Sequence, residues 1–418
     1  MTNNNKLLVI DTSYTYQMIT ERKLFGSVTC RDLGGFFEHV WSVHPFASLL
    51  NTRDWDNYYG KETFYQLNSH HTFIEGKFSR YQFLKSIPPL NFLLAQIRLL
   101  FVLYAIIKKE NISVIRVGSP LYVGLFGLLL SKICKVPLLV RVGSNYDKIY
   151  EATQRPIEKR LFKFRFIEKY IEKLVFSNAN MVAGANQNNL DFALANGAQD
   201  KKSTLFRYGN LIDKGHFILP NNRGTHVCQT SGELFTPDTK VIAFVGRLQL
   251  EKHPEDVITA FEILSNHTPN LKLLMIGDGD LHGDLLNRIK QMGLQDKVWL
   301  VGNKPQDWIV AILPKVHVVL SPHTGRALLE CALAQVGVVA YDIDWQREII
   351  VNNQTGFLVK YRDIKAMANA AKELLENDVK RQRLALRLRT DAENLMSPEK
   401  LDTHERAVYS ALLKSNLT

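Results

Sequence analysis

Residues 317–334 read HVVLSPHTGRALLECALA, and this stretch decides the fold. An apolar run of strand length gives way to a polar turn with one glycine, and a stretch of helical spacing follows that contains Glu330. The first amides of such a helix have no partner within it, so its start favours a phosphate. Glu330 alone is equally typical of a ligand contact and of an exposed helix surface.

The same alternation of apolar runs and helical stretches covers most of the chain. It forms two series of strand-like runs: 6–13, 113–120, 137–145 and 180–188, then 240–247, 271–279, 297–303, 316–323 and 336–344. Near-continuous apolar strands that alternate with helices predict parallel sheets covered on both faces. We therefore predict the α/β class, with two Rossmann-like, doubly wound domains that face a central cleft.

The interval between the two series, residues 219–240, is rich in Pro, Gly, Asn and Thr and marks a domain boundary. We predict an N-terminal domain over 1–215, a linker over 216–237 and a C-terminal domain over 238–395. Residues 396–418 predict a terminal helix that crosses back to the first domain. Ligands of doubly wound sheets bind outside the carboxyl ends of the strands, so we expect the site there.

Composition restricts the class of protein further. The chain has 418 residues, 46% of them hydrophobic and 22% charged, as in a folded protein of two or three domains. Its formal net charge of +11 suits phosphorylated small molecules, anionic lipid or nucleic acid. The sequence shows no nucleic-acid-binding module, so nucleic acid is not an expected partner. The four cysteines are scattered, which argues for a reducing compartment and against structural zinc. The N-terminus, MTNNNKLLVIDTS, is typical of a first strand and not of a cleavable signal, which predicts a cytoplasmic protein.

Two segments raise the question of a membrane. Residues 91–107 are apolar but short for a span and interrupted by Gln96 and Arg98, so we predict a buried helix. Residues 154–176 carry seven Lys or Arg and three Glu and predict an amphipathic helix. Its apolar side would hold Leu161, Phe164, Ile167 and Ile171. We favour a helix packed on the sheet, with attachment to the inner face of an anionic membrane as the alternative.

Two cations follow the strand at 240–247. Arg247, next to Gly246, presents a fork of donors and Lys252 a point charge, a pair that suits a diphosphate. A solvated basic turn is the alternative. The next strand ends in a G-x-G-x-x-x-G pattern that begins with Gly277 and Gly279. That pattern is a weak dinucleotide fingerprint, and a tight turn explains it equally well.

Five motifs occur together in a fixed order. They read GRLQLEK (246–252), GDG (277–279), SPHTGRALLE (321–330), REII (347–350) and NQTGFLV (353–359). In order and spacing they resemble the family 4 glycosyltransferases, which are retaining enzymes of the GT-B fold. The resemblance covers nearly all of 238–395, and it is looser in the first half of the chain.

The resemblance implies a role for each matching residue. Arg247 and Lys252 would be catalytic: they would bind the diphosphate of a nucleotide-sugar donor and stabilise the leaving nucleotide, without a metal or another cofactor. Glu330 would hold the ribose hydroxyls. The remaining donor-binding residues implied by the resemblance are Gly34, Gly35, Gly246, Gly277, Gly279, Val301, Gly302, His323, Thr324, Gly325 and Arg326.

The sequence departs from the family pattern at two positions. Pro322 stands where the family has the first glutamate of its E-x7-E motif, and Gly143 stands where it often has a histidine. His323 could offer a polar contact near the missing acid, or it could be an exposed residue of a turn. The handling of the donor sugar is therefore the part of the function that the resemblance leaves open.

The implied activity is transfer of a sugar from a UDP- or GDP-type donor to a hydroxyl of a glycan or a lipid-linked glycan. Such an enzyme would serve polysaccharide or cell-envelope synthesis as a cytoplasmic protein, peripheral to the membrane. Two other classes stay open. One is a nucleotide-sugar epimerase or hydrolase that uses acids such as Asp11 and Asp147. The other is a nucleotide-sugar-binding protein without catalysis.

Overall fold

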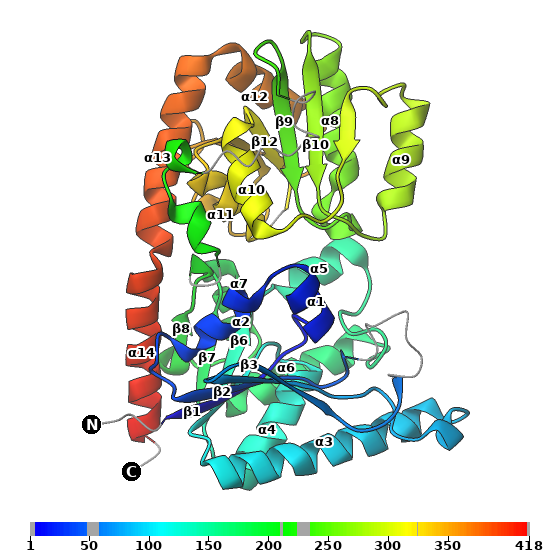
Figure 1. Ribbon diagram of the computed structural model, residues 1–418, viewed down its shortest axis with the longest axis vertical. Helices are drawn as coiled ribbons and strands as arrows, with labels where there is room; N and C mark the ends of the chain where they lie inside the picture. Colours follow the sequence, from blue (N-terminus) through cyan, green and yellow to red (C-terminus); the bar gives the residue numbers. More distant parts are fainter. Residues whose placement is uncertain (1–4, 48–57, 210–211, 224–234, 324, 416–418) are drawn as a thin grey trace. The chain divides into compact units, whose positions relative to one another are not determined.

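The computed structural model describes residues 5–47, 58–209, 212–223, 235–323 and 325–415, and the chain divides into two compact units (Figure 1). Residues Met1–Leu211 and Pro398–Thr418 form the first unit, and Ile212–Ser397 form the second. The predicted linker, 216–237, lies partly outside the described residues. Its described beginning contains two short 3-10 helices, Lys214–Phe217 and Pro220–Asn222.

The second unit is built on a parallel sheet in the order β11-β10-β9-β12-β13-β14. Counted from β9, this is the order 3-2-1-4-5-6 of a doubly wound Rossmann sheet. The order reverses between β9 and β12, and a crevice for ligands forms outside the carboxyl ends of two such strands. The strands are β9 Lys240–Val245, β10 Leu271–Ile276, β11 Val298–Leu300, β12 Val318–Ser321, β13 Gly337–Tyr341 and β14 Phe357–Val359.

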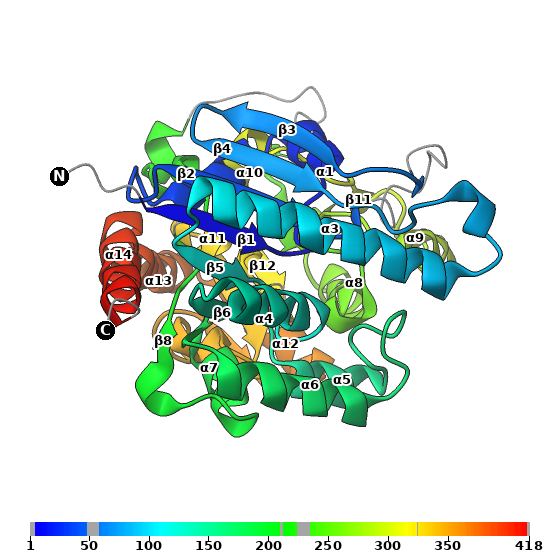
Figure 2. The same cartoon turned by 90° about the horizontal axis from the view of Figure 1, so that it is seen from below.

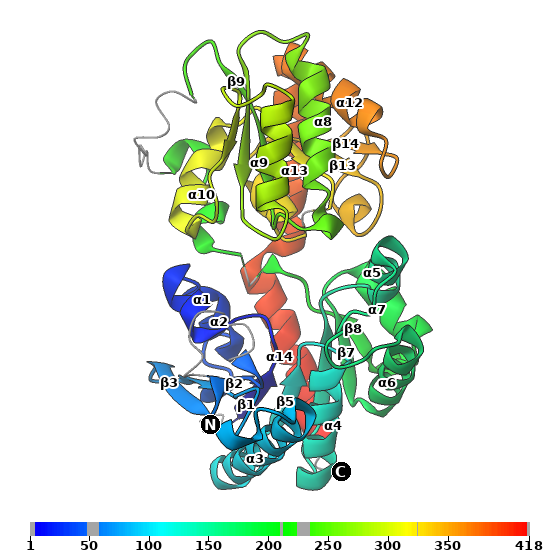
Figure 3. The same cartoon turned by 90° about the vertical axis from the view of Figure 1, so that its right-hand side faces the viewer.

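Helices cover this second sheet on both faces. The side chains of α8, α9 and α12 form one core with the strands, and Figure 3 shows α8 and α9 in front of the sheet. The helix α11, which carries Glu330, lies against α13 and β13. The helices of this unit are α8 Pro254–Ser265, α9 His282–Gln291, α10 Gln306–Ile312, α11 Ala327–Leu333, α12 Ile364–Glu376 and α13 Asp378–Met396.

The first unit has a larger sheet in the order β3-β4-β2-β1-β5-β6-β7-β8. All neighbours pair in parallel except β3 and β4, which are antiparallel. The predicted α/β class and the doubly wound arrangement of each unit are therefore confirmed. The strands are β1 Lys6–Ile10, β2 His39–His44, β3 Thr63–Asn68, β4 His71–Glu75, β5 Val114–Val117, β6 Leu138–Val142, β7 Met181–Gly184 and β8 Ser203–Leu205.

Helices α3, α4 and α6 form one layer on this sheet and share its largest core (Figure 2). The C-terminal helix α14 packs on the opposite face, where Tyr409 and Leu412 are buried against Leu33 and Phe37. The helices of this unit are α1 Tyr16–Glu21, α2 Phe25–Thr29, α3 Pro88–Glu110, α4 Tyr122–Cys134, α5 Tyr146–Thr153, α6 Arg165–Asn178, α7 Gln187–Ala195 and α14 Pro398–Ser415.

The helix predicted over 154–176 is shorter than expected, because α6 begins only at Arg165. Pro156 disfavours a helical conformation in the residue before it, so a helix cannot run through Arg155. Residues 157–161 form a turn instead, in which the amides of Leu161 and Phe162 donate to the carbonyl of Glu158. Phe164, predicted on the buried side, precedes the helix and is 56% exposed, whereas Ile171 is buried as predicted.

The prediction of a buried helix at 91–107 holds for one face of α3 only. Leu99, Leu103 and Ile107 point into the core, while the opposite face is exposed. Of the helices that the structure describes, α3 is the one that is long and apolar enough to cross a membrane by length and composition. About one third of the most apolar stretch of α3 is buried inside the protein.

Candidate functional site

The predicted site residues of the second unit gather at the carboxyl ends of its strands. Gly246 and Arg247 directly follow β9, and Lys252 closes the 3-10 helix Leu250–Lys252. His323 follows β12, the neighbour of β9 in the sheet. The cations and the histidine therefore lie on either side of the point where the strand order reverses, which is the usual ligand position in such a sheet.

Glycines allow the ends of β9, β10 and β11 to approach each other closely. Gly277 has a φ of +135°, and a Cβ atom there would lie 1.9 Å from the carbonyl oxygen of Gly246. A Cβ atom at Gly279 would lie 2.4 Å from the carbonyl oxygen of Leu248. The amide of Gly277 donates to the carbonyl of Gly302 at 3.0 Å. Close backbone approach therefore accounts for the G-x-G pattern without a dinucleotide.

The two cations of the site differ in their surroundings. The Arg247 side chain is 64% exposed and lies 3.4 Å from the carboxylate of Glu251. Lys252 is more enclosed: burial and the nearby charge of Arg247 lower the pKa of its ammonium group to about 8. A bound anion would relieve the repulsion between the two cations, so this pair is suited to hold a diphosphate.

Glu330 is not a surface residue. Its side chain is buried on α11 and lies 3.6 Å from the guanidinium of Arg326. The carboxyl end of α11 is fixed by Arg223 and Arg389, which both donate to the carbonyl of Leu333. A carboxylate held this firmly at the switch point supports the ligand interpretation over that of a solvated helix surface.

The turn before α11 is described except at Thr324, which lies outside the described residues. Gly325 has a φ of +63°, a left-handed conformation that glycine adopts at no steric cost. Val301, predicted to bind the donor, follows β11, and its amide donates to the carbonyl of Met275 at 3.1 Å. The structure thus brings together Gly246, Arg247, Lys252, Gly277, Gly279, Val301, Gly302, His323, Gly325, Arg326 and Glu330 at the carboxyl edge of one sheet.

His323 joins three loops at this edge. Its Nδ1 atom lies 3.0 Å from the carbonyl oxygen of Glu251, and its Nε2 atom lies 3.1 Å from the carboxylate of Asp344. It is half-buried and held on both sides, so the interpretation as a loosely exposed turn residue is wrong. Asp344 was not predicted as a site residue. Its position at the end of the strand-like run 336–344 was the available signal.

A second unpredicted residue, Gln346, supports the same turn. It is almost fully buried, and its amide group donates to the carbonyl of Pro322 at 3.5 Å. Its side-chain oxygen accepts from the amide of Asp344 at 3.0 Å. Gln346 therefore links the backbone at Pro322 to the backbone at Asp344, in the loop after β13.

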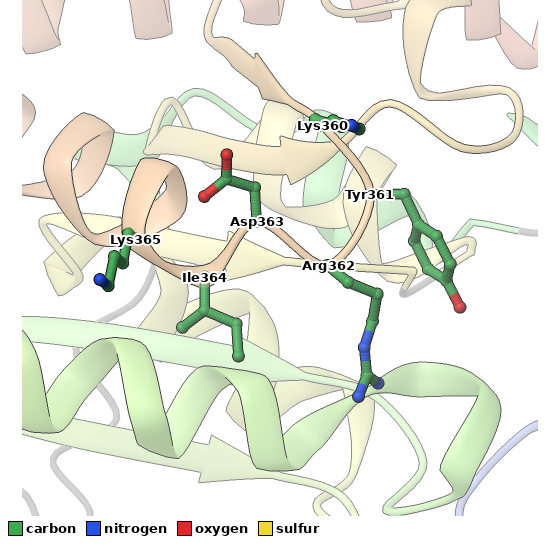
Figure 4. A pocket seen from close by; sticks show the side chains of 6 residues that line it. All are labelled: Lys360, Tyr361, Arg362, Asp363, Ile364 and Lys365. Atoms are coloured by element: carbon green, nitrogen blue, oxygen red, sulfur yellow. The ribbon is translucent and has the colours of Figure 1, made fainter.

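His253 lies beside Lys252 and is uncharged near neutral pH. Burial and the charge of Arg362 lower its pKa to about 4. Arg362 donates to its Nδ1 atom at 2.8 Å, which leaves the Nε2 hydrogen for the hydroxyl oxygen of Tyr361 at 3.2 Å. Figure 4 shows Arg362 reaching toward α8, where it lies 3.5 Å from Asp256. Through its contacts with His253 and Asp256, Arg362 therefore holds the loop that carries Lys252 in place.

The loop after β14, which carries Arg362, borders a hollow of about 430 Å³ (Figure 4). Its lining consists of six consecutive residues, 360–365, of which three are cationic and one, Asp363, caps α12. None of the predicted donor-binding residues lines it. We therefore do not include this hollow in the candidate site.

The structure moves Gly34 and Gly35 away from the predicted site. They lie in the loop before β2, beside Arg406, whose Nε atom donates to the carbonyl of Leu33 at 2.8 Å. Because β1 and β2 run in parallel, this loop is at the amino edge of the first sheet. Donor-binding residues of such a sheet lie at the carboxyl edge, so we leave both glycines out of the site.

The carboxyl edge of the first sheet carries the residues considered for acid–base chemistry. Asp11 is buried and lies 2.6 Å from the guanidinium of Arg31. Burial acts to raise the pKa of Asp147, but hydrogen bonds from Arg165 and Lys169 outweigh it and lower the pKa overall. Both acids are thus held in ion pairs. Gly143 has open space around its Cα atom.

No cluster of three or more His, Cys, Asp or Glu side chains in the described ranges is placed to hold a metal ion. Arg247, Lys252 and Arg326 supply positive charge at this edge of the second sheet. What the arrangement can do chemically is bind an anion beside a buried carboxylate.

Comparison with known proteins agrees with this geometry. Residues 231–390 match the sequence model of the glycosyl transferases group 1. The chain is 23% identical over 332 residues to the capsular polysaccharide biosynthesis glycosyltransferase CapM of Staphylococcus aureus. This match covers 78% of this chain and 83% of CapM. It is 26% identical over 263 residues to the N-acetylgalactosamine-N,N'-diacetylbacillosaminyl-diphospho-undecaprenol 4-alpha-N-acetylgalactosaminyltransferase of Campylobacter jejuni, which covers 62% of this chain and 68% of that enzyme.

Solved structures share the fold over the whole chain. A sucrose-phosphate synthase from Thermosynechococcus elongatus superposes with a TM-score of 0.75 at 17% identity, over 98% of this chain and 100% of that one. The Anabaena protein HepE, in complex with UDP and glucose, superposes with a TM-score of 0.71 at 15% identity, over 97% and 100% of the two chains. The strand order, the motifs of the second unit and these matches agree: residues 231–390 match the glycosyl transferases group 1, the chain has the GT-B fold, and the activity that these findings support is that of a glycosyltransferase.

Proposed function

We propose that the protein is a retaining glycosyltransferase that uses a nucleotide-diphosphate-sugar donor and no metal. Arg247 and Lys252 bind the diphosphate and stabilise the charge that develops on the leaving nucleotide. Glu330 accepts hydrogen bonds from the ribose hydroxyls. No side-chain nucleophile is required, because leaving-group stabilisation and positioning of the acceptor supply the rate.

One observation carries this proposal. A cation pair after β9 and a buried carboxylate on the helix after β12 flank the switch point of a 3-2-1-4-5-6 sheet. The lowered pKa of Lys252 supports the proposal further. Burial disfavours the charged form of this side chain, and a bound diphosphate would offset that cost. His323 and Asp344 provide polar groups in the neighbourhood where the family's first glutamate is missing.

For the acceptor we propose a hydroxyl of a glycan, carried on a lipid diphosphate at the cytoplasmic face of a membrane. The support comes from the names of two relatives, one an enzyme of capsular polysaccharide biosynthesis and one that names a diphospho-undecaprenol acceptor. The product would then belong to a cell-surface polysaccharide.

A thermal-shift panel of nucleotide-sugars tests the donor. We expect one UDP- or GDP-sugar to stabilise the wild-type protein and to lose most of this effect with Glu330→Ala. Loss of two charge-assisted hydrogen bonds corresponds to an affinity lower by roughly a hundredfold. EDTA should leave both the shift and the turnover unchanged.

Arg326→Gln is the matched control. It removes the ion pair with Glu330 and keeps both the carboxylate and the backbone amide at the helix start, through which position 326 is expected to contact the phosphates. If Glu330 serves only as the partner of Arg326, the two variants will lose donor binding and stability equally. An epimerase or hydrolase would release nucleotide or convert the donor without an acceptor, whereas the proposed transferase requires one. Donor binding without turnover on any glycan acceptor would point to the non-catalytic alternative.

A further inference from the structure

The outward face of α3 is mainly apolar, and its one exposed charge before Lys108 is that of Arg98, which pairs with Glu62. Its large apolar side chains recur every three or four residues on the side opposite the core, and Leu93 and Phe101 are 53% and 62% exposed. The stripe extends upstream into the 3-10 helix Gln82–Leu84. Its members are Phe83, Ile87, Leu90, Leu93, Ile97, Phe101 and Tyr104, and we call them the α3 stripe.

Neighbouring helices extend this surface. The helix α4 packs between α3 and α6 and exposes Leu129 and Ile133, while its other apolar side chains face the sheet. The helix α6 exposes two aromatic rings, Phe166 and Tyr170, about 70% each. Figure 2 shows the three helices as one layer. Contiguous apolar surface of this extent marks an interaction site on a soluble protein.

The segment that carries the α3 stripe is basic, and the two carboxylates beside α3, those of Glu62 and Glu110, are held in ion pairs. Residues 77–135 contain nine Lys or Arg and a single carboxylate, that of Glu110. Lys85, Lys132 and Lys135 are exposed near the ends of the helices, and Glu110 lies 3.2 Å from the ammonium group of Lys6. A surface that combines apolar side chains with cations and lacks free acids complements an anionic lipid headgroup layer.

The helix is fixed parallel to the surface of the unit and does not span. Its inner side chains belong to the core, and the side-chain amide of Gln96 donates to the carbonyls of Pro45 and Lys77 at 3.2 Å each. The hydroxyl of Tyr122 donates to the Gln96 carbonyl oxygen at 2.8 Å. A helix held in this way presents about 35 Å of apolar stripe in one plane, the geometry of an interfacial helix.

We propose that the α3 stripe, with Leu129 and Ile133, inserts into the headgroup region of an anionic bilayer, and that the exposed cations Lys85, Lys132 and Lys135 bind its lipids. The occupant is a membrane surface and not a protein. The proposal deepens the proposed function, because a lipid-linked acceptor requires an enzyme that works at a membrane. It locates the membrane contact on α3 and α4, whereas the sequence had offered the basic segment 154–176.

Vesicle sedimentation with the full chain tests the proposal. The wild-type protein should bind vesicles of phosphatidylcholine mixed with phosphatidylglycerol, bind pure phosphatidylcholine weakly, and dissociate as salt is raised. Leu93→Gln/Phe101→Gln should lower binding by roughly tenfold or more, since two large apolar side chains no longer leave water. Lys132→Gln/Lys135→Gln should lower binding to the anionic vesicles by about tenfold.

The matched control is Val379→Gln/Leu386→Gln, which alters two equally exposed apolar side chains on α13 in the second unit. It should leave vesicle binding unchanged. Should the double variant of α3 fail to fold, Phe101→Trp provides a second test: bromine-labelled lipid chains should quench its added fluorescence, and should not quench that of Val379→Trp.

The proposal is overturned if wild-type protein ignores anionic vesicles, or if the α3 and α13 variants behave alike. It is also overturned if the wild type sediments as a dimer that Leu93→Gln/Phe101→Gln converts to a monomer without any vesicle binding, because the face is then an interface between two copies. Donor binding in the thermal-shift panel is measured without vesicles. Failure of the donor site with intact vesicle binding would therefore reject the proposed function and leave the membrane surface standing.

Discussion

The imidazole of His323 hydrogen-bonds the carboxylate of Asp344 at 3.1 Å and thereby joins the loops that follow β12 and β13. The second ring nitrogen faces the carbonyl oxygen of Glu251 at 3.0 Å, in the loop that carries Lys252. Both partners are hydrogen-bond acceptors, so a ring nitrogen that carries a hydrogen can donate to the one it faces. The histidine thus positions a carboxylate beside the backbone of Pro322.

We expect His323→Ala to lower kcat/KM for the donor by roughly tenfold to a hundredfold, because two hydrogen bonds that align the loops are lost. Asp344→Ala should have an effect of similar size. The measurement is steady-state kinetics with the donor identified by the thermal-shift panel. If the pair acts as a unit, the double variant will be little worse than either single one.

Asp342→Ala is the control for this pair. Asp342 follows the same strand, but its carboxylate pairs with the exposed Arg347. Its removal should change kcat/KM by less than about twofold. An equal loss in the control and in Asp344→Ala would show that removal of any carboxylate from this loop lowers kcat/KM, and would refute the positioning role of His323.

The lowered pKa of Lys252 predicts how donor binding depends on pH. With a pKa of about 8, the free enzyme loses this cation as the pH rises through 8, and it keeps the charge below that value. Because the charged form binds the diphosphate, kcat/KM for the donor should fall about tenfold per pH unit above pH 8. Substrate-saturated kcat should fall at a higher pH, since the bound anion raises the pKa.

Lys252→Arg separates this effect from general loss of activity. Arginine stays charged throughout the range, so the variant, although weaker, should give a kcat/KM profile that is flat between pH 7 and about 9.5. A profile that still bends near pH 8 in this variant would assign the titration to another group.

Much of the fold could be predicted because it depends on local patterns. Apolar runs of strand length that alternate with helical spacing fixed the parallel sheets, and the motifs of 246–330 placed the cations and Glu330 at strand ends. These are properties of consecutive residues. The burial of Glu330 could not be read in this way, since it depends on α13 and on Arg223 and Arg389, which are remote in the chain.

The unpredicted features depend on distance in sequence or on what a helix packs against. His323 and Asp344 are brought together by two neighbouring strands, and no periodicity reports that contact. The α3 stripe was not predicted, because a helix that is apolar on all sides is expected to be buried on all sides. Gly34 and Gly35 were misplaced because two helices and a 3-10 turn lie between β1 and their loop and return the chain to the amino edge.

Gly277→Ala should destabilise the second unit strongly. The new Cβ atom would meet the carbonyl oxygen of Gly246 at 1.9 Å, at a φ of +135° that only glycine tolerates. We expect a loss of at least about 3 kcal/mol in the free energy of unfolding. Gly302→Ala is the matched control, because its φ of +69° is also left-handed but its surroundings are open. It should cost about 1–2 kcal/mol in urea unfolding, and equal costs would contradict the close-approach argument.

Two buried histidines of the first unit predict acid sensitivity. Burial lowers the pKa of His44 to about 4, although the charge of Asp11 opposes this. Burial and the charge of Arg31 lower the pKa of His71 to about 3. In the unfolded chain both titrate near 6.5, so between pH 6.5 and 4 the unfolded state binds more protons and stability falls as the pH is lowered. Each histidine should contribute about 1.4 kcal/mol per pH unit in that window.

Urea unfolding at pH 7.5 and at pH 5, followed by hydrogen exchange of the amides in β2 and β4, measures this loss for the first unit. His71→Gln removes one titrating group and keeps an acceptor for the hydroxyl of Ser42, which now lies 2.7 Å from the ring. His71→Gln should halve the pH dependence of the free energy of unfolding, whatever its effect on stability at pH 7.5. His70→Gln, an exposed neighbour, should leave the dependence unchanged. A full pH dependence in His71→Gln would mean that protonation of the buried ring does not drive acid unfolding.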